Sequence, residues 1–449
     1  MPKAQTYQCP NCGGVLYFNA EIGKFKCDFC ESEFEEGEVK GDIPISDEVV
    51  EKKETKKAES ISDFLERAPW EVTADGSVNA VVYSCPSCAA EVVADQSTVS
   101  TTCPYCGNNM LVQGLATKDN IPEWVMPFTI TQEAAKERLS QHFEHKWYLS
   151  RKFNAQLEHL QGMYIPYYLY DMDIKGAGTY IGYETETSTD SDGDTHEERY
   201  YYAITRAGHA SFERIPVNGS SKMPDGHMDA IAPFPFNKMK PFDASYAAGY
   251  LMEVADTESD ACQPKAQRLV EASFKKDLEA DARHERGVDG IEETITLATK
   301  VELSKLSSAV LPVWMMYCTW DDVDMLFAVN GDTGKCVGDL PVQGGRRAAT
   351  IGGTFVGSAI IGFIIFMLIG TDGSGDTDFR VLIGVIIAVF LITLFVDGHF
   401  MGQMRTAVEA TNASMSYTAE GLVVDERWCG RRRNSTRSAK KDLERHLNE

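Results

Sequence analysis

Eight of the chain's 12 cysteines form four C-x2-C pairs, and this arrangement restricts the possible folds more than any other feature of the sequence. The pairs fall into two sets. In each set 14 residues separate one pair from the next, and the second set repeats the first at an offset of 76 residues. Four thiolates at this spacing surround one tetrahedral ion, with metal–sulfur bonds of about 2.3 Å. The sequence therefore predicts two structural metal sites, formed by Cys9, Cys12, Cys27 and Cys30 and by Cys85, Cys88, Cys103 and Cys106.

Zinc is the ion that these sites favour, and iron in a rubredoxin-like site is the alternative, because the same four thiolates suit both metals. The residues after Met1 are polar and soon reach the first cysteine pair. We therefore expect no secretory leader and a reducing compartment, where paired cysteines bind metal instead of forming disulfides. Each module is too small for a core of its own, so the ion supplies folding energy of about 10 kcal/mol or more. Four cysteines leave no open coordination position, so we expect two structural zinc ions per chain.

Two long apolar segments predict a membrane hairpin. Residues 351–370 contain no charged side chain, and residues 379–396 contain only Arg380, at the edge of the segment. Helices of this length are long enough to cross a hydrocarbon layer of about 30 Å. Two helices buried in the core of a soluble protein are the alternative interpretation.

The residues that flank these segments predict their orientation. Arg346 and Arg347 precede the first segment and Arg405 follows the second, whereas the connecting residues 371–378 contain three aspartates and no basic side chain. The positive-inside rule then predicts a two-pass protein of the cell membrane with both termini in the cytoplasm. The first segment also contains a G-x-x-x-G pattern, Gly353 and Gly357, through which two helices or two copies of the chain can approach closely.

The charge of the chain argues against a protein that coats nucleic acid. Asp and Glu total 67 and Lys and Arg 43, for a net charge of −24, whereas phosphate binding requires an excess of cations. Residues 80–117, which contain the second cysteine set, have no Lys, Arg or His. We therefore expect both metal modules to bind proteins or to be structural. The tail at residues 427–445 is different: its eight basic side chains either bind anionic lipid headgroups or belong to a disordered end.

The central block, residues 122–345, mixes helical and strand patterns. Helical periodicity predicts one helix over residues 132–161, with Thr131 as its N-cap, and another over residues 264–283. Alternating and apolar runs predict two strand pairs, a hairpin of residues 179–187 and 198–208 and a second pair of residues 310–320 and 325–331. A Pro-Phe step, a helix and an apolar strand with a central proline occur in this order from residue 127 and again from residue 241, as in a degenerate duplication.

Together these patterns predict a multidomain α+β protein with two small zinc ribbons, a central mixed α+β domain and a two-helix transmembrane hairpin. The stretch between the ribbons alternates acids and lysines with almost no aromatic residues, so we expect a solvated linker and ribbons that move independently. The expected parts are a first ribbon at 1–35, a linker at 36–62, a second ribbon at 78–118, the central domain at 122–345, the hairpin at 351–396 with helices at 351–370 and 379–396, and a cytoplasmic segment with a basic tail at 397–449.

Several motifs together resemble those of a known family. They are CPNCGG from Cys9, CDFC from Cys27, YIPYYLYD from Tyr164, VLPVWMMYCTW from Val310, AVNGDTGKCVGDLP from Ala328, and the apolar hairpin. Over most of its length the chain resembles bacterial membrane proteins with TFIIB-type zinc ribbons, which are often labelled PriA-like helicases. Some members resemble the membrane component that works with PspA and SPFH-type proteins in the envelope stress response. The resemblance implies a membrane anchor or recruiting platform rather than an enzyme.

Motifs for phosphate binding and for nucleophilic catalysis are missing from the sequence. It contains neither G-x-x-x-x-G-K-[ST] nor G-x-S-x-G, so we expect no ATP-driven helicase, no serine hydrolase and no catalytic residues. We expect a non-enzymatic docking platform on the cytoplasmic side, whose partners are cytosolic or membrane-associated proteins, PspA- or SPFH-type proteins among them, and membrane lipid. The alternative is a nucleic-acid-binding or replication-related, PriA-like zinc-ribbon protein tethered at the membrane.

Overall fold

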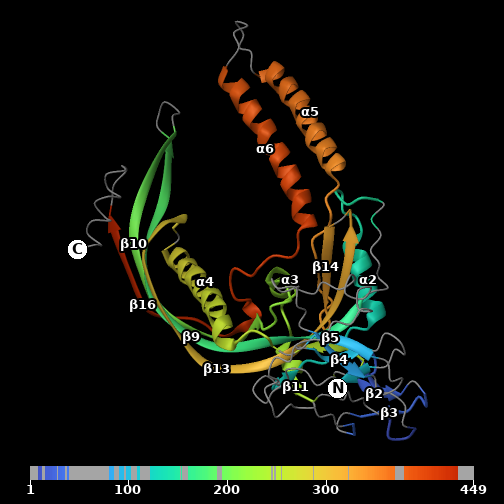
Figure 1. The fold of residues 1–449 in the computed structure, drawn as a ribbon. Coiled ribbons are helices and arrows are strands. Elements are labelled where there is room, and N and C mark those ends of the chain that lie inside the picture. The colour runs from blue at the N-terminus through green and yellow to red at the C-terminus, as the bar shows by residue number, and fades with distance from the viewer. Residues whose placement is uncertain are drawn as a thin grey trace.

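The structure is a computed structural model. It describes residues 9–39 with short gaps, the strands at 80–84, 91–95, 98–102 and 109–111, and, again with short gaps, residues 122–189, 195–369 and 379–432. Figure 1 shows two arms that rise from a common base in the same direction. One arm is the helical hairpin of α5 (Gly344–Ile369) and α6 (Phe379–Met404), and the other is the curved end of a large β-sheet. A small N-terminal sheet that includes β2 (Lys24–Cys27) and β3 (Glu33–Phe34) lies at the base.

In the described part of the chain the large sheet has 11 strands, and four of them form the curved arm. β9 (Gln161–Thr189) pairs antiparallel with β10 (Thr195–Asn218) on one side and with β13 (Gly290–Trp320) on the other, and β16 (Thr418–Arg432) adds the strand beyond β10. The other strands of this sheet are β6 (Thr98–Thr102), β7 (Asn109–Leu111), β8 (Trp124–Val125), β11 (Lys240–Pro241), β12 (Leu251–Glu253), β14 (Val323–Asn330) and β15 (Cys336–Val337).

Both predicted strand pairs are confirmed, although the strands are longer than expected. β9 and β10 form the predicted hairpin, and β13 and β14 pair around a turn in which Asp321 has a φ of 50°. β13 begins at Gly290, well before the predicted residue 310, because its polar first half pairs with β9 along the arm. That pairing joins residues more than a hundred positions apart, so local sequence patterns do not reveal it.

Each face of the sheet carries its own core. Alternate residues of one strand enter opposite cores, as in β9, where Ile165 belongs to one cluster and Tyr164 to the other. α4 (Ser259–Arg286) covers the concave face of the arm with a buried stripe that includes Phe274 and Leu278, and it confirms the second predicted helix. The buried Arg206 of β10 pairs with Asp281 of this helix at 2.7 Å and fixes α4 to the sheet.

The first predicted helix is wrong in its length. α2 (Gln132–Phe143) begins as expected, since the Thr131 hydroxyl accepts a hydrogen bond from the Ala134 N–H at 3.2 Å. It ends at Phe143 because Glu144 is extended and His145 adopts the left-handed region with a φ of 59°, and neither conformation continues a helix. Beyond this point Trp147 and Tyr148 contact Phe400 of α6, whereas Phe153 still packs on Phe143 of α2.

The register of the two central strands has twofold symmetry. Pro166 of β9 pairs with Val310, and Pro312 of β13 pairs with Tyr164. The short strands repeat this relation, because β8 pairs in parallel with β13 and β12 pairs in parallel with β9. The order β8, α2, β9, β10 thus corresponds to the order β12, α4, β13, β14 in its pairings, and the internal duplication itself stays a prediction. The counterpart of β8 is β12 rather than the segment at Pro241, which lies in β11 and pairs with β8 itself.

Both predicted apolar segments are helical, and both helices extend beyond the predicted limits. α5 begins at Gly344 rather than at residue 351, and α6 ends at Met404 rather than at residue 396. Only 6% and 11% of their apolar windows are buried, and Phe395 is 76% exposed, so the structure does not place these two helices in the core of the chain. The shorter helix α3 (Asp225–Ala230) lies between the arms near the base (Figure 1). Two 3-10 turns occur at Phe236–Lys238 and Met415–Tyr417.

Candidate metal centre and its attachment to the central domain

The first cysteine set lies on two loops held by a three-stranded sheet. β1 (Leu16–Asn19) and β2 form a hairpin whose turn is closed by the Asn19 side chain, which accepts a hydrogen bond from the Glu21 N–H at 2.9 Å, and by Gly23 with a φ of 66°. β3 completes the sheet next to β2. The second C-x2-C loop is closed by hydrogen bonds of 3.0 Å from the Glu31 N–H to the Cys27 carbonyl and from the Cys27 N–H to the Ser32 carbonyl. The strands therefore hold the two loops opposite each other.

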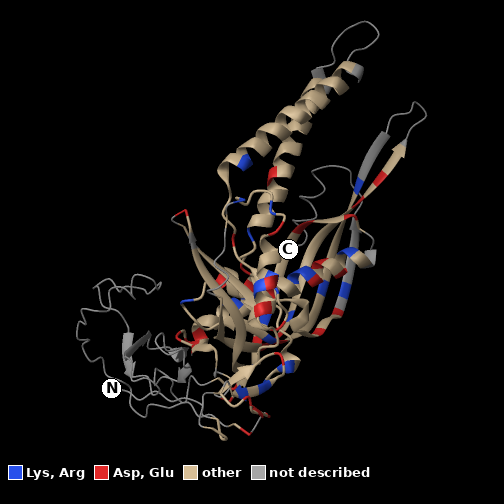
Figure 2. Cartoon of the chain, turned by 90° about the vertical axis from the view of Figure 1, so that its right-hand side faces the viewer, with Lys and Arg blue, Asp and Glu red and all other residues tan. Residues whose placement is uncertain are grey.

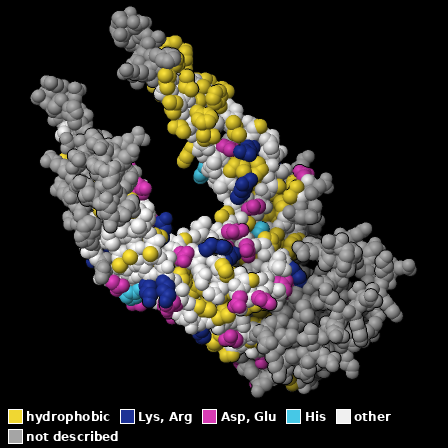
Figure 3. Space-filling model, turned by 60° about the vertical axis from the view of Figure 1, so that its left-hand side comes forward, with side chains coloured by type: hydrophobic (Ala, Val, Ile, Leu, Met, Phe, Trp, Pro, Cys, Tyr) yellow, Lys and Arg dark blue, Asp and Glu magenta, His cyan; other side chains and the backbone are white. Residues whose placement is uncertain are grey.

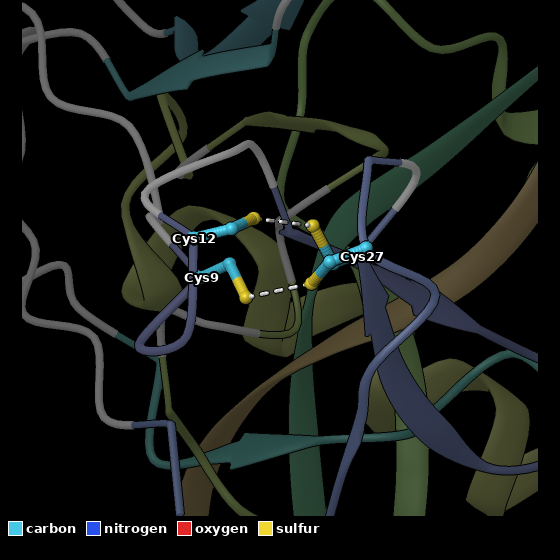
Figure 4. Close-up of side chains that lie close together, drawn as sticks. Cys9, Cys12 and Cys27 are labelled. Carbon is cyan, nitrogen blue, oxygen red and sulfur yellow. Dashed lines mark hydrogen bonds between the residues drawn. The ribbon is translucent and has the colours of Figure 1, made fainter.

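The four sulfur atoms of Cys9, Cys12, Cys27 and Cys30 lie close enough together to surround one ion. Figure 4 shows Cys9, Cys12 and Cys27 of this cluster, with their side chains turned toward one another. The Sγ atoms of Cys9 and Cys30 lie 3.5 Å apart, those of Cys12 and Cys27 also lie 3.5 Å apart, and all four lie within 4.8 Å of one another. A tetrahedral ion with bonds of about 2.3 Å separates its ligand sulfurs by about 3.8 Å. The donor set and its spacing therefore fit a four-coordinate thiophilic metal ion.

Polar groups around Cys30 favour its thiolate form. The Ser32 hydroxyl lies 3.1 Å from the Cys30 Sγ, and this contact is the main reason that the pKa of Cys30 falls to about 6. Asn11 donates to the same hydroxyl at 3.0 Å and orients it. A lowered pKa reduces the competition between protons and a metal ion for the Cys30 sulfur. Lys24, whose pKa is raised by Glu35 at 2.7 Å, adds an exposed ion pair at the edge of the sheet.

The second predicted set, Cys85, Cys88, Cys103 and Cys106, lies outside the described residues. The backbone around it forms two strand pairs, β4 (Ala80–Ser84) with β5 (Glu91–Asp95) and β6 with β7. β6 also pairs with β12 of the central domain, which connects this region to the large sheet. The structure thus brings one four-cysteine cluster together, and the second site stays a prediction.

The prediction that the first ribbon moves independently is wrong, because the ribbon shares a core with the central domain. Phe18 and Phe25 pack on the Tyr246 ring at centroid distances of 5.2 and 5.9 Å. Tyr250 donates a hydrogen bond to the Phe18 carbonyl at 3.3 Å and stacks on Phe128 with ring centroids 4.1 Å apart. Burial raises the pKa of Tyr250, so its hydroxyl remains a hydrogen-bond donor. The sheet of the central domain thereby supplies the apolar surface that a module of this size lacks.

A groove of about 350 Å³ follows the boundary between the ribbon and the central domain. Tyr17, Asn19 and Glu21 line it from the ribbon, and Gln132 and Gln161 line it from α2 and β9. Phe29, between Cys27 and Cys30, is 75% exposed and adds an apolar side chain on the metal loop. The groove presents a mixed polar and aromatic surface, and Phe29 presents an exposed aromatic ring. Protein interfaces use both kinds of surface.

The helical hairpin is joined to the central domain by a charged contact that the sequence analysis missed. Arg347 of α5 binds both carboxylate oxygens of Asp397 of α6, at 3.0 and 2.8 Å, and the Tyr148 hydroxyl donates to the same carboxylate at 3.0 Å. The Gln343 N–H donates to the Tyr148 carbonyl at 2.8 Å. The sequence does show an acidic residue, Asp397, directly after the second apolar segment, which is a signal that a charged contact forms there. It does not show that the partner is Tyr148, which lies 249 positions away. These contacts fix the base of the hairpin.

Comparison with known proteins adds one relative. The chain is 24% identical over 356 residues to the uncharacterized protein YdjG of Bacillus subtilis (strain 168), an alignment that covers 64% of this chain and 98% of YdjG. No family model matches the chain. No solved structure matches it either. The class defined by the fold is therefore a mixed α+β protein with a four-cysteine cluster and two helices long and apolar enough to cross a membrane.

Proposed function

We propose that this chain is a non-enzymatic docking platform for other proteins, anchored in a bacterial cell membrane by α5 and α6, with its termini in the cytoplasm and zinc in both four-cysteine sites. The proposal includes membership of the TFIIB-type zinc-ribbon membrane proteins that the sequence resembles, with PspA- or SPFH-type envelope stress proteins as partners. The observation that carries it is an exposed apolar hairpin with a charged clamp at its base, formed by Arg347, Asp397 and Tyr148.

The hairpin supports membrane anchoring through its chemistry. Figure 2 shows charged side chains spread over the body of the protein and gathered at the base of the hairpin, whereas the described helices above the base carry almost none. Exposing apolar side chains such as Phe355, Ile361 and Phe395 to water costs free energy, and the hydrocarbon of a bilayer removes that cost. The clamp of Arg347, Asp397 and Tyr148 then holds the metal ribbon and the sheet at a fixed position beneath the bilayer.

The metal ribbon supports docking rather than catalysis. Four thiolates fill the coordination sphere of a zinc ion and leave no position for water or substrate. A four-thiolate zinc site carries two negative charges, which adds to the acidic character of the chain and opposes binding to phosphate. The exposed Phe29 and the groove beside the ribbon offer apolar and polar contacts to a protein instead.

Phe29 provides the direct test of docking. A photoreactive phenylalanine analogue at position 29 of the full-length chain in intact cells is expected to form discrete protein adducts, which then identify the partner. With that purified partner, Phe29→Ala is expected to lower affinity about tenfold or more, as for a central interface aromatic, without changing the metal content. Ile22→Ala is the matched control, because Ile22 is also an exposed apolar residue of the ribbon, 39% exposed, but lies in the β1–β2 turn. Adducts with nucleic acid, or salt-sensitive sub-micromolar DNA binding by the purified chain, would favour the replication-related alternative.

Cysteine labelling tests the proposed topology. In Ser374→Cys, a thiol lies in the acidic connection between the two apolar segments, which the positive-inside rule places outside the cell. A membrane-impermeant maleimide is expected to label this variant in intact cells and to leave the wild-type chain, with its 12 cysteines, unlabelled until the cells are permeabilised. Labelling of the wild type in intact cells, with no additional thiol labelled in the variant, would invert the orientation.

A further inference from the structure

An open groove of about 440 Å³ lies at the base of the helical hairpin, on the side of Trp147. Its lining includes Trp147, Arg346, Thr350, Gly353, Val396 and Phe400. It therefore extends from the polar end of α5 into the part of the hairpin that the proposed function places in the bilayer. Figure 3 shows the same gradient on the surface, with hydrophobic side chains along the hairpin and basic ones at its base.

The upper part of the groove is apolar and open. A Cβ atom added at Gly353 would meet no atom within 4 Å, so this glycine leaves room beside the Val396 and Phe400 side chains. The Trp147 indole is 56% exposed, and its N–H donates to the Thr350 hydroxyl at 2.8 Å. The indole N–H is thus hydrogen-bonded to α5 while much of the ring is exposed. Tryptophan side chains at membrane–water interfaces commonly have both properties.

The lower end of the groove carries a positive charge. Arg346 donates to the main-chain carbonyls of Trp147 at 3.2 Å and of Leu149 at 2.6 Å. In the described part of the chain it forms no ion pair, whereas its neighbour Arg347 is neutralised by Asp397. The carbonyls orient the Arg346 guanidinium but do not neutralise its charge. The groove therefore has a cation at its solvent-facing end and apolar side chains at the end nearer the middle of the hairpin.

We infer that this groove binds one phospholipid of the cytoplasmic leaflet with an anionic headgroup, its phosphate near Arg346 and an acyl chain beside Gly353. The inference rests on the proposed membrane insertion of α5 and α6. Charge complementarity selects the anionic headgroup, because a basic side chain near the bilayer surface attracts one. The position of the groove favours a lipid over a soluble phosphate, because its apolar wall lies at the level of the bilayer where acyl chains surround the helices.

Two neighbouring glycines allow a matched test. Gly353→Leu fills the groove, whereas Gly352→Leu adds the same side chain one position away, where an added Cβ also meets no atom within 4 Å and which does not line the groove. The full-length protein, purified in detergent, is mixed with equal amounts of phosphatidylglycerol and phosphatidylcholine, and retained lipid is counted by native mass spectrometry. The wild type and Gly352→Leu are expected to retain one phosphatidylglycerol, and Gly353→Leu is expected to retain at least about fivefold less.

A substitution at the charged end separates the headgroup from the acyl chain. Arg346→Gln keeps a hydrogen-bond donor for the two carbonyls and removes the charge, so it is expected to lower the preference for phosphatidylglycerol over phosphatidylcholine about fivefold while total lipid retention changes little. Equal lipid retention by the two glycine variants would overturn the inference. Loss of an oligomer in Gly353→Leu without a change in retained lipid would overturn it in favour of a second copy of α5 in the groove. Extraction of the wild-type chain from membranes by carbonate would instead refute the anchoring itself.

Discussion

Replacing Cys27 with alanine is expected to remove one metal equivalent from the chain and to unfold β1, β2 and β3 while the large sheet stays folded. Cys27 is fully buried at the end of β2, and its Sγ is one of the four that converge on the site. The binding of a structural zinc ion contributes about 10 kcal/mol or more, which short strands cannot replace. Amides of β1 and β2 are therefore expected to exchange with solvent at least about a hundredfold faster.

The measurements are metal analysis and hydrogen exchange on the full-length protein in detergent. Cys336→Ala is the matched control, because it removes the same thiol from a half-buried position outside the cluster and is expected to leave the metal content unchanged. The wild type is expected to contain two equivalents of zinc, and two equivalents of iron would identify the alternative metal. Unchanged metal content in the Cys27 variant would show that the four sulfurs do not form the site.

Local features of the sequence were sufficient to predict the cysteine cluster and the helical hairpin. The four ligands of the first site fall within 22 residues, so their spacing alone specifies a tetrahedral donor set. The apolar segments are likewise continuous in sequence, so their length and composition alone predict two long apolar helices. The β9–β10 hairpin was also predictable in position because its two strands are adjacent in the chain.

Contacts between distant residues explain what the sequence did not reveal. The helix predicted over residues 132–161 ends at Phe143, and beyond it Tyr148 bonds to Asp397 and the Trp147 indole bonds to Thr350, contacts that spacing within the segment cannot anticipate. The ribbon likewise looked independent because its tyrosine partner at position 250 lies 232 residues from Phe18. In both cases a single sequence shows that an apolar residue needs burial but not which surface buries it.

Replacing Tyr250 with alanine is expected to detach the first ribbon from the sheet without releasing its metal ion. Tyr250 is 7% exposed, its ring stacks on Phe128, and its hydroxyl donates to the Phe18 carbonyl. Truncation of a buried aromatic side chain costs about 3 kcal/mol or more, and here that cost falls on the contact between ribbon and sheet. Limited proteolysis of the full-length protein is expected to cut between the ribbon and the central domain much faster, with metal content unchanged.

Tyr250→Phe separates the two contributions of this side chain. It keeps the stacking on Phe128 and removes the hydroxyl that donates to the Phe18 carbonyl, so it is expected to cost about 1 kcal/mol and to change the proteolysis rate only slightly. Together with the Cys27 variant, these substitutions establish which interaction depends on the other. If metal binding folds the ribbon and the aromatic core only positions it, Tyr250→Ala retains zinc and Cys27→Ala loses both zinc and attachment. Loss of zinc in Tyr250→Ala would instead mean that the central sheet is required to form the metal site, and that the ribbon is not a folding unit of its own.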